Sequence, residues 1–163
     1  MPDTDHVRIE RSFAAPIDLI WAMWTQPDHF SAWYGPAGAA IPRAAMDVRV
    51  GGSRSIDMTM DSPGGVMEMH FVGQYLEVEP RSRLVYTEAK ANSAGVALTA
   101  EQMGLPAETP METSVVVDLT DAGGRTLMVV THVGVPADSP GAQGWGAALD
   151  KMEAHAADLV RGQ

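Results

Sequence analysis

The chain has 163 residues, 45% of them apolar and 20% charged, a composition typical of a folded domain that builds its own core. It contains no cysteine, which excludes disulfide scaffolds, thiolate metal sites and cysteine nucleophiles. The formal net charge of −10 disfavours nucleic acid and anionic membrane surfaces as partners, because both would repel the chain.

The sequence shows no signal-peptide pattern at its start. No stretch approaches the roughly 20 apolar residues that are needed to cross a bilayer. We therefore predict a cytoplasmic protein without membrane insertion. We expect one domain over residues 1–163, with residues 1–6 disordered.

The first part of the chain predicts a strand followed by two short helices. Residues 7–13 alternate between apolar and polar side chains, as a half-exposed strand does. Pro16 fits the first position of a helix, and Ile20 and Trp24 follow at helical spacing. Pro27 then begins a second short helix.

The middle of the chain predicts a series of antiparallel strands separated by turn residues. The strands are expected over residues 44–50, 56–60, 67–72, 84–90, 112–119 and 126–133. Gly73 falls at the end of one of these patterns and predicts a bulge or a bend, which would curve the sheet.

Residues 91–110 interrupt this rhythm. Within them, Thr99 and Gln102 have the spacing of a capping box, and Gly104 is suited to end a short helix. A connection of this length is usually functional or mobile. We predict a loop insertion that serves as a lid.

A long helix is predicted at the end of the chain. Ser139 is its expected N-cap and Pro140 its first residue. Its apolar residues recur at steps of three and four, which gives one strong face: Trp145, Leu149, Met152, Ala156 and Leu159.

These elements together predict an α+β fold. An antiparallel sheet with one apolar face needs a cover, and only the last helix is long enough to provide it. We expect a curved antiparallel sheet of about six to seven strands wrapped on the C-terminal helix. A space between this sheet and helix is a candidate cavity.

Methionine is frequent, with 11 residues, and this suggests an interior that can rearrange around a guest molecule. We predict ligand contacts from side chains expected to face the candidate cavity: Met58, Met60, Met69, Phe71, Tyr86, Met128, Trp145 and Met152. His132 is a candidate polar anchor. The alternative for each apolar residue is an ordinary place in the core.

The sequence gives little support to catalysis. It contains no nucleophile-elbow, phosphate-loop or dinucleotide motif, and we predict no cofactor. His132 is a weak candidate for a general acid or base, and it would have to share a proton with Tyr86 or Glu88. A hydrogen-bonded structural histidine is the alternative. Glu68 and His70 share a strand face, but no third ligand is evident, so we predict no metal site.

Several short segments occur in an order that is typical of one family. They are Pro16 with Trp21, residues 27–36 (PDHFSAWYGP), residues 47–52 (DVRVGG), residues 73–78 (GQYLEV) with 83–86 (RLVY), residues 124–126 (GRT), and residues 131–132 (TH) with 144–145 (GW). Together they resemble the activator of heat-shock-protein-90 ATPase homologue-like family. That family belongs to the START-like helix-grip superfamily, also called SRPBCC, so the resemblance implies the fold described above.

The resemblance leaves the activity open, because the superfamily includes lipid carriers, hormone binders, polyketide cyclases and cochaperone domains. Our leading hypothesis is a protein that binds an apolar or aromatic small molecule between sheet and helix. An enzyme of the cyclase or hydrolase kind, using the same cavity, is the second.

The third hypothesis is a chaperone cofactor, another protein-interaction module or a homodimer. It would use an exposed patch formed by Trp33 and Tyr34 with the Gly35-Pro36 turn. The alternative is that Trp33 closes the end of the core.

Overall fold

A computed structural model describes residues 6–108, 111–135 and 140–162 of the chain. The strands are β1 (Val7–Phe13), β2 (Ala39–Met46), β3 (Ser53–Ser62), β4 (Gly65–Glu79), β5 (Arg83–Ala91), β6 (Glu112–Asp121) and β7 (Thr126–Val133). The helices are α1 (Ile17–Thr25), α2 (Pro27–Phe30), the short 3-10 helix η2 (Glu101–Met103) and α3 (Pro140–Arg161).

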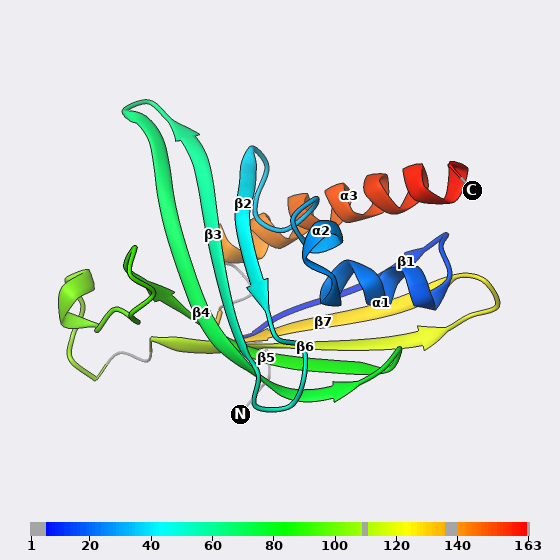
Figure 1. Cartoon of the computed structure of the whole chain (residues 1–163), viewed down its shortest axis with the longest axis horizontal. Helices are drawn as coiled ribbons and strands as arrows, with labels where there is room; N and C mark the ends of the chain where they lie inside the picture. Colours follow the sequence, from blue (N-terminus) through cyan, green and yellow to red (C-terminus); the bar gives the residue numbers. More distant parts are fainter. Residues whose placement is uncertain (1–5, 109–110, 136–139, 163) are drawn as a thin grey trace.

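The strands form one antiparallel sheet of seven strands in the order β1-β7-β6-β5-β4-β3-β2. The sheet curls, so that β2 and β3 rise beside the start of α3 while β6 and β7 run beneath it (Figure 1). Helices α1 and α2 occupy the hollow between the two arms of the sheet (Figure 1). The predicted α+β helix-grip architecture is confirmed.

The pairing of β4 with β5 is interrupted near the middle of β4, close to the end of its pairing with β3. The β4–β5 register shifts between Tyr75 and Glu77, which marks a bulge just after the predicted position. Gly73 itself has another role: a Cβ atom there would lie 1.8 Å from the carbonyl oxygen of Thr87. Only glycine allows the two backbones to approach this closely.

Strand β2 begins and ends earlier than the pattern over residues 44–50 predicts. It covers Ala39–Met46, and residues 47–52 form a turn in which the Gly52 amide donates to the carbonyl of Arg49. Within this turn Gly51 has a φ of +83°, and Val50 remains 68% exposed. Pro42 is tolerated because β2 is an edge strand whose register shifts between Ala40 and Arg43.

Helix α3 packs one face against the sheet and the early helices. Trp145, Leu149, Met152 and Ala156 are buried on that face, and Leu159 packs partly against the core. The predicted apolar stripe is therefore confirmed. Its proposed N-cap, Ser139, lies outside the described residues.

Of the two interpretations of Trp33 and Tyr34, the place at the end of the core is confirmed and the exposed patch is wrong. Trp33 is fully buried and Tyr34 is 6% exposed, because the segment after α2 turns inward under α3. The Trp33 indole Nε1–H donates to the Met23 carbonyl at 2.9 Å, and the Tyr34 ring stacks on Phe30. This aromatic group closes one end of the core and offers no exposed surface to a partner.

The described part of the 91–110 segment contains the predicted capping box. The Gln102 amide donates to Thr99 Oγ1, the Thr99 amide donates to Gln102 Oε1, and Gly104 follows with a φ of +74°. Residues 109–110 lie outside the described part, as do the predicted disordered residues 1–5. His6 is described, and its Nδ1 accepts a hydrogen bond from the Gly134 amide. In the described chain, no helix is both long and apolar enough to cross a membrane.

Candidate functional site

A cavity of about 290 Å³ lies between strands β3 and β4 and the first turns of α3. Strands β3 and β4 contribute Met58, Met60, Met69 and Phe71, and β5 and β7 contribute Glu88 and His132. The remaining wall comes from the segment after α2 and from α3: Tyr34, Gly35, Pro36, Gly144, Trp145 and Ala148. Most of these side chains are apolar.

Most of the sequence-predicted contacts reach this cavity. Met58, Met60, Met69, Phe71, His132 and Trp145 all line it. Tyr86, Met128 and Met152 do not; they are almost completely buried in the core. The Met128 sulfur, for example, accepts a hydrogen bond from Trp24 Nε1 at 3.3 Å, so it packs against α1 instead.

The sequence reasoning missed the wall formed after α2 and the small residues of α3. Gly35 has a φ of +93°, a backbone conformation that favours glycine, and a Cβ atom there would also lie 2.9 Å from Ala39 Cβ at the start of β2. The Gly35-Pro36 turn was visible in the sequence. Nothing in the sequence showed that it folds over the cavity.

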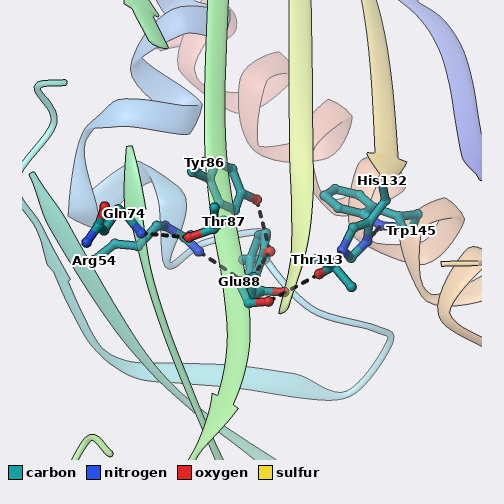
Figure 2. Close-up of polar contacts among 9 residues, drawn as sticks. Arg54, Gln74, Tyr86, Thr87, Glu88, Thr113, His132 and Trp145 are labelled. Carbon is teal, nitrogen blue, oxygen red and sulfur yellow. Dashed lines mark hydrogen bonds and ion pairs between the residues drawn. The ribbon is translucent and has the colours of Figure 1, made fainter. Parts of the chain in front are cut away.

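A buried ion pair supports the cavity from the sheet side (Figure 2). The Arg54 side chain is 1% exposed and its Nη1 donates to Glu88 Oε2 at 3.2 Å. The Tyr34 hydroxyl donates to the same oxygen at 2.8 Å. Since this uses the Tyr34 proton, the Tyr86 hydroxyl at 3.0 Å is the donor to Tyr34.

Arg54 lies within a ring of aromatic side chains. Its Cζ is 3.8 Å from the centroid of the Tyr86 ring, and the rings of Phe30, Tyr34 and Tyr75 surround it at up to 6.0 Å. Such cation–π contacts partly replace lost hydration. Arg54 was not singled out from the sequence, although it shares the alternation of Ile56 and Met58 and so had to face inward.

Burial raises the pKa of the Tyr34 hydroxyl well above its ordinary value, and the nearby Glu88 carboxylate raises it further. The hydroxyl therefore stays protonated at neutral pH and acts as a hydrogen-bond donor. Glu88, which the sequence analysis named as a possible proton partner of His132, lines the cavity with 11% of its side chain exposed.

His132 is held by two hydrogen bonds (Figure 2). Its Nδ1 accepts from Trp145 Nε1–H at 2.9 Å, which leaves the proton on Nε2, and Nε2 donates to Thr113 Oγ1 at 2.8 Å. Burial lowers the pKa of this imidazole and favours its neutral form. Neither nitrogen bonds to Tyr86 or to the Glu88 carboxylate, so the proton-sharing pair required by the enzyme hypothesis is not formed.

The residues considered for a metal site are engaged elsewhere. His70 Nδ1 lies 2.8 Å from Asp57 Oδ1 on the outer sheet surface, while Glu68 is exposed. The described residues contain no group of three or more metal-ligating side chains.

A scan against protein families matches residues 14–157 to the family described as Activator of Hsp90 ATPase homolog 1-like protein. The chain belongs to this family. Its fold is the START-type helix-grip fold, as the segments quoted from the sequence imply.

Several solved structures share this fold with the chain at low sequence identity. A protein from Nitrosomonas europaea is 23% identical with a TM-score of 0.75, and the match covers 98% of both chains. A protein from Arthrobacter aurescens is 19% identical with a TM-score of 0.76, over 96% of this chain and 88% of the other. The AHSA1 protein from Silicibacter pomeroyi is 19% identical with a TM-score of 0.69, over 93% and 97%. A search of curated proteins found no match.

Proposed function

We propose that this protein binds one small apolar or aromatic molecule in the cavity between β3, β4 and α3. The observation that carries the proposal is the cavity itself: about 290 Å³, walled by methionine and aromatic side chains inside an otherwise packed fold. Pockets of this kind, apolar with a few placed polar groups, are typical of small-molecule sites.

The size of the cavity limits the ligand. Pockets for drug-sized molecules span roughly 300–1,000 Å³, so this cavity lies at the lower end of that range. It therefore suits a ligand of one or two rings, or a short aliphatic chain.

The proposed contacts are Met58, Met60, Met69 and Phe71 on the sheet side and Trp145 on the helix side. The unbranched methionine side chains can change rotamer around ligands of different shape at small cost. Tyr86, Met128 and Met152 would support this wall from the core without touching the ligand.

A neutral fluorescent probe with two fused rings, Prodan, tests the proposal. Its emission shifts to the blue in an apolar environment, so we expect saturable binding to the wild-type protein. Gly144→Leu should reduce Prodan affinity at least tenfold, because Gly144 lines the cavity and a leucine side chain there would fill the space that the ligand needs. Leucine favours a helix more than glycine does, so this variant should fold.

Gly146→Leu is the matched control on the same helix. A Cβ atom at Gly146 meets nothing within 4 Å, and Gly146 does not line the cavity. We expect wild-type affinity from this variant. Absence of saturable Prodan binding, or equal binding by both variants, would refute the proposal.

A further inference from the structure

The side-chain hydrogen-bond donors that line the cavity are already used within the protein. The Tyr34 hydroxyl donates to Glu88 Oε2, and Trp145 Nε1 donates to His132 Nδ1. His132 Nε2 in turn donates to Thr113 Oγ1, whose own proton goes to the Glu88 carbonyl at 3.2 Å. A ligand that only accepts hydrogen bonds would therefore find no free side-chain donor in the wall.

The wall does retain an acceptor. Both hydrogen bonds to the Glu88 carboxylate, from Tyr34 and from Arg54, go to Oε2. Oε1 receives none from the described residues, and Glu88 lines the cavity with 11% of its side chain exposed. A carboxylate oxygen in a largely apolar site binds a donor strongly, because few water molecules compete for it.

The cationic side chains near the cavity do not supply a donor for an anionic ligand. Arg54 Nε and Nη2 are buried and have no partner among the described residues, but Arg54 does not line the cavity and its guanidinium group lies over the Tyr86 ring. An anionic ligand would meet the Glu88 carboxylate first. Lys151 donates to the carbonyl of Pro36 at 3.1 Å and does not line the cavity either.

Building on the proposed binding function, we propose that the ligand is an apolar alcohol or phenol whose hydroxyl donates to Glu88 Oε1. The same geometry disfavours carboxylates such as fatty acids, because their charge would lie against that of Glu88 without a donor. Arg54 already balances the Glu88 charge, so a neutral donor is the best complement.

Displacement of Prodan by three matched compounds at pH 7.5 tests this preference. They share one ring and an ethyl group and differ in the opposite substituent: 4-ethylphenol (hydroxyl), 4-ethyltoluene (methyl) and 4-ethylbenzoate (carboxylate). We expect 4-ethylphenol to bind about tenfold more tightly than 4-ethyltoluene, the effect of one hydrogen bond to a charged acceptor. We expect 4-ethylbenzoate to be the weakest.

The outcomes separate this inference from the proposed function. If Prodan and 4-ethyltoluene bind while 4-ethylphenol gains nothing, or 4-ethylbenzoate binds as tightly as 4-ethylphenol, the donor preference is wrong and the binding function stands. Tight 4-ethylbenzoate binding would point to Lys151. If Prodan itself does not bind, the proposed function fails and this inference with it.

Glu88→Gln tests the named residue, with Glu68→Gln on the exposed part of β4 as the matched control. A glutamine can donate as well as accept, so the affinity ratio of 4-ethylphenol to 4-ethylbenzoate should fall roughly tenfold in Glu88→Gln only. Since that change leaves Arg54 without its charge partner, Arg54→Met/Glu88→Gln provides a second measurement in a neutral site. An unchanged ratio in whichever of these variants folds would overturn the assignment to Glu88.

Discussion

Arg54 and Glu88 are the residues on which both the core and the cavity wall depend. Arg54 is a permanent cation with a side chain only 1% exposed, and Glu88 is the one carboxylate bonded to it within residues 6–108, 111–135 and 140–162. Two of the Arg54 nitrogens are buried and have no partner in the part of the chain that the structure describes. The pair is therefore costly to bury and still more costly to break.

Glu88→Ala should reduce the free energy of unfolding by about 3–5 kcal/mol, because it leaves the Arg54 charge buried and unpaired. The double variant Arg54→Met/Glu88→Ala should recover most of that loss. Urea denaturation of the three proteins measures both values. A loss below about 1 kcal/mol in the single variant would show that the ion pair does not matter for stability.

His132 gives the protein a predicted dependence on pH. Burial lowers the pKa of His132 below its ordinary value of 6.5, and the Glu88 carboxylate offsets this only in part. Below about pH 6.5 the unfolded chain therefore binds a proton that the folded chain does not, so stability falls as the pH decreases. Above that pH both states are neutral at His132 and its contribution is constant.

Urea midpoints measured from pH 8 to pH 5 should show this decrease in the wild type and a shallower one in His132→Gln. NMR titration of the His132 ring protons gives the pKa of the folded state directly. A midpoint that rises on acidification in this range, or a His132 pKa above 6.5, would contradict the assignment.

At the residue scale, the sequence was a better guide to the apolar side chains near the cavity than to the polar network beside them. Strand alternation correctly placed Met58, Met60, Met69 and Phe71 at the wall. Alternation also assigned Tyr86 and Met128 to the inner face of the sheet. Whether a residue on that face borders the cavity or lies in the core depends on how α1 and α2 pack, and no local sequence pattern specifies that packing. The Arg54–Glu88 pair joins positions 34 residues apart, and no spacing rule predicts such a contact.

At the element scale, the close approach of β4 and β5 at Gly73 shapes the sheet. The space that a side chain would need there is filled by the Thr87 backbone, 1.8 Å from an added Cβ. Gly73 lies just before the register shift between Tyr75 and Glu77 in the β4–β5 pairing, and β3 and the first half of β4 rise beside the start of α3 (Figure 1). These two strands carry the methionine wall of the cavity.

Gly73→Ala should destabilise the protein by about 1–3 kcal/mol or more, because the strands must separate to admit a methyl group. Gly64→Ala is the control: it lies in the β3–β4 turn, and an added Cβ there meets nothing within 4 Å. That change should stay within about 0.5 kcal/mol of the wild type. Thermal or urea unfolding measures both, and equal stability of the two variants would contradict this role for Gly73.

Element boundaries were predictable where the chain carries explicit stop signals. Residues 7–13 and 126–133 were predicted with the bounds that β1 and β7 show. The prediction for β2 was shifted because alternation continues through Val50, whereas the strand ends at Met46 and residues 47–52 form a turn. Turn geometry outweighed hydrophobic periodicity at that point.

At the scale of the whole molecule, the fold follows from the order of the elements. One long amphipathic helix and a single antiparallel sheet leave one arrangement that covers the apolar sheet face, and the family segments agree with it. The cavity was foreseen as a space, but its shape was not. The segment after α2 and the small residues of α3 decide the shape, and these are tertiary contacts.

The predicted role of residues 91–110 as a lid remains a prediction. None of the residues that line the cavity comes from the described part of this segment, residues 91–108. A lid would have to move toward the cavity on binding. Hydrogen exchange at Thr99 and Gln102 with and without 4-ethylphenol would reveal increased protection if it does, and unchanged protection would exclude this role.

The central claim is that an apolar ligand binds inside this cavity, and the methionines report on it directly. In protein labelled with ¹³C at the methionine methyl groups, an aromatic ligand such as 4-ethylphenol shifts the signals of the methyls it contacts. We predict large, saturable shifts for Met58, Met60 and Met69, with Met23 in the distant core and the exposed Met103 unchanged. Shifts confined to exposed methionines, or no saturable shift at all, would contradict the account.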